Sequence, residues 1–201
     1  MALLFANNNS LSAITTKPSG LSGGALNLIS TQTASSSSTI SFTSGIDSTY
    51  DEYVFKCYDI HPSASNPNFG FQVDVGTGTS YAQTITSTYF AAYHTEDGGT
   101  AALAYIAGQD QAQGTGLQTL ADQIGNGNDE STAGTLHLFN PSNTTFVKHF
   151  IGRFQGYNGS DYSTDLNIAG YVNTTTALTR VQFKFSSGNI DSGVIKLYGV
   201  S

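Results

Sequence analysis

The chain has 201 residues, of which 38% are hydrophobic, 10% are charged, 22 are glycine and 4 are proline. Its net charge is −7, and its seven basic residues are scattered, which excludes a basic nucleic-acid surface and a helix lying on an anionic membrane. A single cysteine excludes an internal disulfide, and no apolar run reaches the roughly 20 residues that span a bilayer. The length fits one all-β sandwich or barrel.

Residues 1–39 differ from the rest of the chain and are predicted to form an extended N-terminal arm. Leu3, Leu4 and Phe5 form an apolar group near the start, and polar residues with a serine run follow. Only residues 25–29 predict a strand. The three apolar side chains either fray with the terminus or dock on a neighbouring subunit.

The densest aromatic and β-branched run lies at 50–60, with the sequence YDEYVFKCYDI. Apolar side chains occupy both sets of alternating positions, which predicts a central strand with little of either face in water. Cys57 is therefore predicted to be a small buried hydrophobic residue rather than a catalytic thiol. Pro62 ends the run, because proline cannot donate to a strand ladder.

Further strands are predicted wherever apolar and polar residues alternate between turn signals. The segment 145–154 is apolar on both faces and again predicts two-sided burial. Residues 109–124 are ambiguous, since apolar residues at helical spacing stand between glycines; they predict either a loop plus a strand or one short helix. The sum is about nine or ten strands in an antiparallel β-sandwich of jelly-roll type over residues 40–201.

No motif in the sequence indicates catalysis or a bound cofactor. None of the four histidines has metal-site spacing, and the pair His137 and His149 lacks an evident third ligand. There is no G-x-S-x-G elbow and no evident pair of facing acids. The run 126–130 matches a calcium loop only weakly. We therefore expect no enzyme, no cofactor and no metal.

Tyr157 and Tyr162 lie in a polar segment, GYNGSDYS, that is predicted to be a loop. Loop tyrosines can stack on sugars or anchor a protein interface. They can also cover the edge of a core, and the sequence does not separate these uses.

Three stretches resemble a family of uncharacterised proteins of tailed bacteriophages, especially marine phages that infect cyanobacteria and other ocean bacteria. They are 39–62 (TISFTSGIDSTYDEYVFKCYDIHP), 136–155 (LHLFNPSNTTFVKHFIGRFQ) and 169–199 (AGYVNTTTALTRVQFKFSSGNIDSGVIKLYG). The resemblance covers most of residues 25–199. It implies a virion structural protein and carries no catalytic residues. Residues 1–24 and the loop 109–130 agree least, and they are expected to set the attachment to the particle; the sequence does not decide whether the loop binds an ion or a partner.

Two roles are compatible with the resemblance. The favoured one is a capsid decoration or cement protein, a homotrimer seated on the shell beside the major capsid protein, without nucleic acid or membrane. The alternative is a tail, fibre or baseplate component, which would bind host glycans or an adaptor. A secreted lectin or polysaccharide enzyme is disfavoured by the absence of tryptophan, paired acids and an evident signal peptide.

Overall fold

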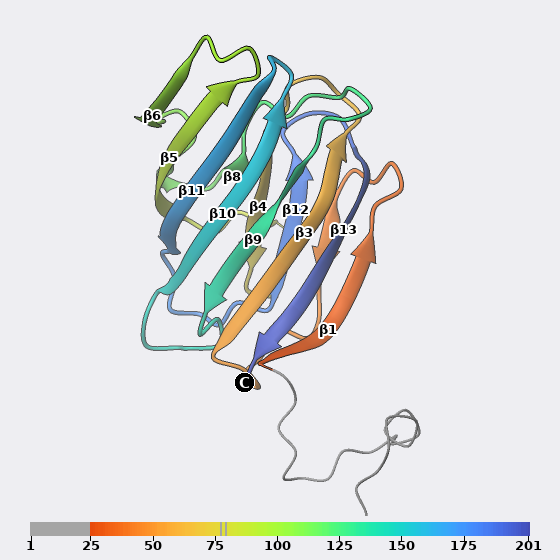
Figure 1. Cartoon of the computed structure of the whole chain (residues 1–201). Coiled ribbons are helices and arrows are strands. Elements are labelled where there is room, and N and C mark those ends of the chain that lie inside the picture. The colour runs from red at the N-terminus through yellow and green to blue at the C-terminus, as the bar shows by residue number, and fades with distance from the viewer. Residues whose placement is uncertain (1–24, 77, 79) are drawn as a thin grey trace, which may run out of the picture.

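A computed structural model describes residues 25–201 apart from residues 77 and 79. This part of the chain contains no helix, and its strands form two sheets that face each other (Figure 1). In chain order the strands are β1 (Leu26–Thr33), β2 (Ile40–Phe42), β3 (Glu52–Pro62), β4 (Phe69–Asp74), β5 (Ile85–Thr95), β6 (Ala101–Tyr105), β7 (Ala112–Gly114), β8 (Gln118–Ala121), β9 (Thr132–Phe139), β10 (Lys148–Asn158), β11 (Tyr162–Val172), β12 (Arg180–Phe185) and β13 (Ile190–Val200).

The two antiparallel sheets are of unequal size. The large sheet has the order β1-β13-β3-β9-β10-β11-β5-β6, and β7 also pairs with β5. The small sheet has the order β2-β12-β4-β8. Strand β8 packs over β10 and β11, so β6 and the end of β5 extend past the small sheet, as Figure 1 shows at its upper left.

Aromatic rings fill the space between the sheets. Phe55 of β3 lies 5.2 Å from Phe183 of β12, and Phe71 of β4 lies 5.1 Å from Phe150 of β10, measured between ring centroids. All four are at most 1% exposed. Burying each such side chain is worth about 1.5–3 kcal/mol, so these contacts hold the layers together.

The prediction of an all-β antiparallel sandwich is confirmed. The described residues form thirteen strands rather than nine or ten. Two of them, β7 and β8, come from the 109–124 segment, which contains no helix. The jelly-roll type remains a prediction, since a jelly roll has eight strands and these sheets have nine and four.

The strand predicted at 25–29 is present, and it is longer than expected. It forms β1 and pairs with β13 along its length, with Leu26 opposite Val200 and Thr33 opposite Val194. The sandwich therefore begins before residue 40. Ser36 and Ser37, beyond β1, also bond to the β13 backbone, so residues 26–39 belong to the body of the fold.

The expectation of two-sided burial is wrong for the segment at 145–154 and holds for only part of the segment at 50–60, where Val54, on the face opposite Phe55, is 2% exposed. Phe55 is 0% exposed, whereas Tyr58 on the other face of β3 is 41% exposed. Along β10, Phe150 is 1% exposed and its neighbour Ile151 is 52% exposed. Alternation along a strand decides which face of the sheet each side chain lies on. The inner face becomes buried because the small sheet covers it, and the small sheet covers only that face of the large sheet.

Candidate functional site

The outer face of the large sheet is not covered by any segment that the structure describes. Eight large hydrophobic side chains are exposed in the described part of the chain, and seven of them lie on this face by strand register. These seven, which we call the outer patch, are Leu26, Leu28, Tyr58, Phe90, Leu103, Tyr105 and Ile151. The eighth, Phe146, lies in the loop between β9 and β10.

Strand register spreads the outer patch over the whole width of the sheet. Leu28 pairs with Tyr198 at one edge, and Ile151 lies near the centre. At the other edge, Phe90 of β5 lies directly opposite Tyr105 of β6. A surface of this extent is far wider than one ligand would occupy, and exposed apolar side chains gathered on one sheet face are typical of a protein interface.

Two pairs of acidic and basic side chains lie on the outer face. Arg153 donates two hydrogen bonds to the Asp165 carboxylate, at 2.9 and 2.8 Å. Glu52 accepts a hydrogen bond from His137 Nδ1. Because these four groups are paired within the sheet, covering them would leave fewer isolated charges buried than covering unpaired groups.

Two lysines of the outer face are held over tyrosine rings. Lys56 and Lys196 are direct partners on β3 and β13. The Lys56 ammonium lies 5.7 Å from the centre of the Tyr198 ring, and the Lys196 ammonium lies 5.7 Å from that of Tyr58. These reciprocal contacts are within cation–π range, so the lysines lie along the sheet instead of standing free above it.

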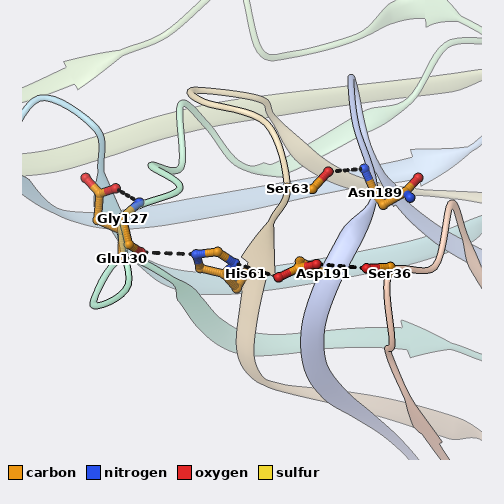
Figure 2. A network of polar contacts seen from close by, with 7 residues as sticks. All are labelled: Ser36, His61, Ser63, Gly127, Glu130, Asn189 and Asp191. Carbon is orange, nitrogen blue, oxygen red and sulfur yellow. Dashed lines mark hydrogen bonds and ion pairs between the residues drawn. The ribbon is translucent and has the colours of Figure 1, made fainter.

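A polar network joins four segments at the end of the sandwich where β3 ends and β13 begins (Figure 2). His61 Nε2 donates to the Gly127 carbonyl at 3.0 Å, and its Nδ1 lies 3.8 Å from Asp191 Oδ2. Ser36 donates to Asp191 Oδ1 at 2.9 Å. The Glu130 carboxylate accepts from the Gly127 backbone N–H. The network therefore fastens the loop after β8 and the segment after β1 to the strand ends.

This network has an acid and a histidine in proximity, but its serines do not complete a nucleophilic relay. Ser36 contacts the acid, and Ser63 Oγ accepts from the Asn189 N–H at 2.8 Å. Among the described residues no serine hydroxyl bonds to the His61 ring, whereas a serine nucleophile needs its base within hydrogen-bond reach. The contacts present are those of a structural clamp.

The structure separates the two tyrosines that the sequence grouped in one loop. Tyr157 ends β10 and Tyr162 begins β11, in a hairpin whose turn is only residues 159–161. Tyr157 has the register of the outer face, and Tyr162 has the register of the inner face. The physical reason is pairing: Asn158 lies opposite Tyr162, so Tyr157 lies opposite Ser163 and points to the other side.

Tyr157 lies beside acidic groups. Its hydroxyl donates to Asp161 at 3.2 Å. Burial, together with the carboxylates of Asp161 and Glu96, raises the pKa of Tyr157 to about 12. The phenol therefore remains neutral at physiological pH, and this end of the sheet is acidic.

Tyr162 lines a cleft beneath the overhanging end of the large sheet. Its ring meets that of Tyr93 of β5 edge-to-face, with centroids 5.7 Å apart. We call this the tyrosine cleft; its volume is about 400 Å³, and its other walls include Ile106, Asp122 and Asn158. Sequence analysis missed all of these except Tyr162, because only strand register and the path of the chain after β8 bring them together.

The remaining candidates of the sequence analysis have simple environments. Leu3, Leu4 and Phe5 lie outside the described residues. Cys57 is buried, as predicted, and burial raises the pKa of its thiol. Within residues 25–201, apart from 77 and 79, no three His, Cys, Asp or Glu side chains are grouped so that they could hold a metal ion.

Comparisons with known proteins give no relative for this chain: no family model, no curated protein and no solved structure matches it. The part of the chain that the structure describes has no helix long and apolar enough to cross a membrane.

Proposed function

We propose that this protein is a structural component of a bacteriophage virion, and specifically a capsid decoration or cement protein that stabilises the shell through subunit contacts. The observation that carries the proposal is the outer patch: seven exposed large hydrophobic side chains lie on one uncovered sheet face. The resemblance of three segments to phage structural proteins supplies the setting. In this role the protein is not an enzyme, and it assembles with its partners in the host cytoplasm.

The energetics of the outer face favour association. A stable interface buries about 800 Å² on each partner, and its core is depleted of charged residues and enriched in aromatic ones. Three of the seven residues of the outer patch are aromatic, and beside it the Arg153–Asp165 pair is satisfied within the sheet while Lys56 and Lys196 lie over tyrosine rings. We infer that this face contacts other copies of the chain, as a homotrimer, and the major capsid protein.

A tail, fibre or baseplate position is the second candidate. The tyrosine cleft favours it, because a solvent-accessible aromatic cleft at one end of the sandwich suits recognition of something outside the particle. Immunogold labelling of intact particles distinguishes the two positions, since label on the head supports decoration and label on the tail supports the second candidate.

The interface itself is tested by changing the outer patch in the full-length protein. Ile151→Glu combined with Leu103→Glu places two charges on the proposed contact surface, where both side chains are more than half exposed. We expect the variant to fold but to sediment as a monomer in analytical ultracentrifugation and to lose attachment to shells.

Phe146→Glu is the matched control, because it removes an exposed aromatic side chain that lies in a loop away from the sheet. It should retain both assembly and shell attachment. A wild-type protein that is monomeric and does not bind shells would contradict the proposal, and so would full assembly of the double variant.

A further inference from the structure

The tyrosine cleft lies on the inner side of the large sheet, past the edge of the small one, and the assembly proposal does not use it. Its apolar wall consists of Tyr93, Tyr162 and Ile106. Each of the three side chains is only partly buried. The cleft therefore offers aromatic surface that is held in place by the Tyr93–Tyr162 contact and is still open to solvent.

A carboxylate held by a hydrogen bond also lines the cleft. The Tyr89 hydroxyl, on a side chain that is 0% exposed, donates to Asp122 Oδ1 at 2.8 Å. Burial and the Asp122 carboxylate both raise the pKa of Tyr89, so this phenol remains a donor at physiological pH. In the described part of the chain no group donates to Asp122 Oδ2, which leaves one oriented acceptor for a ligand.

Two amide side chains complete the polar wall. Asn158 Oδ1 accepts from the backbone N–H groups of Ser160 and Tyr162, at 3.0 and 3.1 Å. Its Nδ2 makes no hydrogen bond within the described residues. Gln123 is exposed, and its backbone is held by Asn68 and Gly159. The cleft therefore combines an oriented acceptor with amide donors.

This combination has the chemistry of a sugar site. A pyranose ring has an apolar face of C–H groups that packs on the negative face of an aromatic ring. Each hydroxyl at its edge donates one hydrogen bond and accepts others, so it matches a carboxylate beside amide groups. A purely apolar ligand would cover Asp122 Oδ2 without giving it a hydrogen-bond donor, which is costly.

The charge of the rim narrows the class of sugar. Glu96, Asp97 and Asp161 lie together at the end of the hairpins next to the cleft, with Asp122 inside it. An anionic sugar such as a uronate would meet like charges. We infer that the tyrosine cleft binds a neutral hexose residue of an oligosaccharide or polysaccharide, a function that goes beyond assembly through the outer face.

The test uses the full-length protein and defined neutral oligosaccharides: cellohexaose, maltohexaose and β-1,4-mannohexaose. Saturation-transfer NMR detects binding, and ¹H–¹⁵N spectra locate it. We expect at least one of the three to bind and to shift the amide signals of Tyr93, Gln123 and Tyr162. Hexaguluronate, which carries a carboxylate on every ring, should bind more weakly than that neutral sugar.

Variants assign the binding to the cleft. Tyr162→Ala should weaken the affinity at least about tenfold, because it removes one ring of the pair. Tyr171→Ala is the matched control, since it removes a partly buried tyrosine from the same strand with the register of the outer face. Asp122→Asn keeps an oxygen for the Tyr89 hydroxyl but removes the charge, and it should also weaken binding.

Gln123→Asn is a milder variant that tests the cleft even if one of the other variants fails to fold. It changes an exposed side chain at a position with a φ of 53°, which asparagine tolerates, and it shortens the reach of the amide. A reduced affinity in this folded variant supports the inference. The inference is overturned by absence of binding to all three neutral sugars, by equal or tighter binding of hexaguluronate, or by an affinity unchanged in Tyr162→Ala.

Discussion

The two faces of the large sheet have similar kinds of apolar residue and opposite environments. On β3, Phe55 is fully buried against Phe42 and Phe183, while Tyr58 on the other face is 41% exposed. On β10 the same contrast separates Phe150 from Ile151. The inner face stabilises the fold, and the outer face retains apolar surface that the monomer does not bury. Apolar content alone therefore does not identify a core: the second layer does.

The difference between the two faces is tested most directly by truncating one residue on each face of β3. Phe55→Ala should lower the free energy of unfolding by about 3–5 kcal/mol, because it opens a cavity among aromatic rings. Tyr58→Ala should lower it by less than about 1 kcal/mol, because Tyr58 is 41% exposed and lies outside the packed core. Denaturant unfolding measures both. Equal losses would mean that the outer face is as tightly packed as the inner one.

A charged residue on the buried side gives the next largest effect. Lys148 is 0% exposed, and its ammonium donates to the carbonyls of Phe146 and Thr174 at 3.2 and 3.1 Å. Lys148→Met keeps the stem but leaves two carbonyls unsatisfied, so we expect a loss of about 1–3 kcal/mol. Lys196→Met on the outer face is the control and should be near neutral. A melting curve of Lys148→Met that matched the wild type would show that water replaces the ammonium.

The smallest effect is expected for an ion pair of the outer face. The Arg153 guanidinium lowers the pKa of Asp165 from its ordinary value of 3.8. A lowered pKa in the folded state adds stability above pH 3.8, and this stability is lost as the pH falls through the folded value. Both side chains are substantially exposed, so the gain is small.

Thermal melts of the wild type and Asp165→Asn check this prediction. The small difference between them should be present at neutral pH, vanish in strong acid, and shrink in high salt. A difference that grew on acidification would contradict the assigned direction of the pKa shift.

Much of the fold was predictable because period-2 alternation is a local property. The pattern over 69–75 gives β4, and the run at 50–60 gives β3, displaced by two residues at each end. The segment 109–124 was not predictable, since helical spacing of its apolar residues competed with a strand. Gln118 is fully buried in β8, where its amide bonds to Ser87 and Gln109. These partners come from β5 and from the turn before β7, so no local pattern indicates them.

The candidate sites were less predictable than the fold. The sequence singled out Tyr162, but its partner Tyr93 is 69 residues away in the chain (162 minus 93) and meets it only through strand register. Asp122 had no local signal, since its orientation depends on the hydroxyl of Tyr89. Two residues of the outer patch, Tyr58 and Ile151, were visible in the sequence as apolar residues of strands that are apolar on both faces. The solvent exposure of the outer patch could not be predicted, because it depends on which part of the large sheet the small sheet covers.

The pairing of β1 with β13 has a mechanical consequence. Leu26 lies opposite Val200, and the Ser201 N–H bonds to the Ala25 carbonyl at 3.3 Å. A force pulling Ala25 and Ser201 apart would break the hydrogen bonds between β1 and β13 one after another, so β1 would unzip from β13 rather than shear along it. A tether attached at Ala25 should therefore peel β1 away under low tension while the aromatic layers between the sheets stay closed.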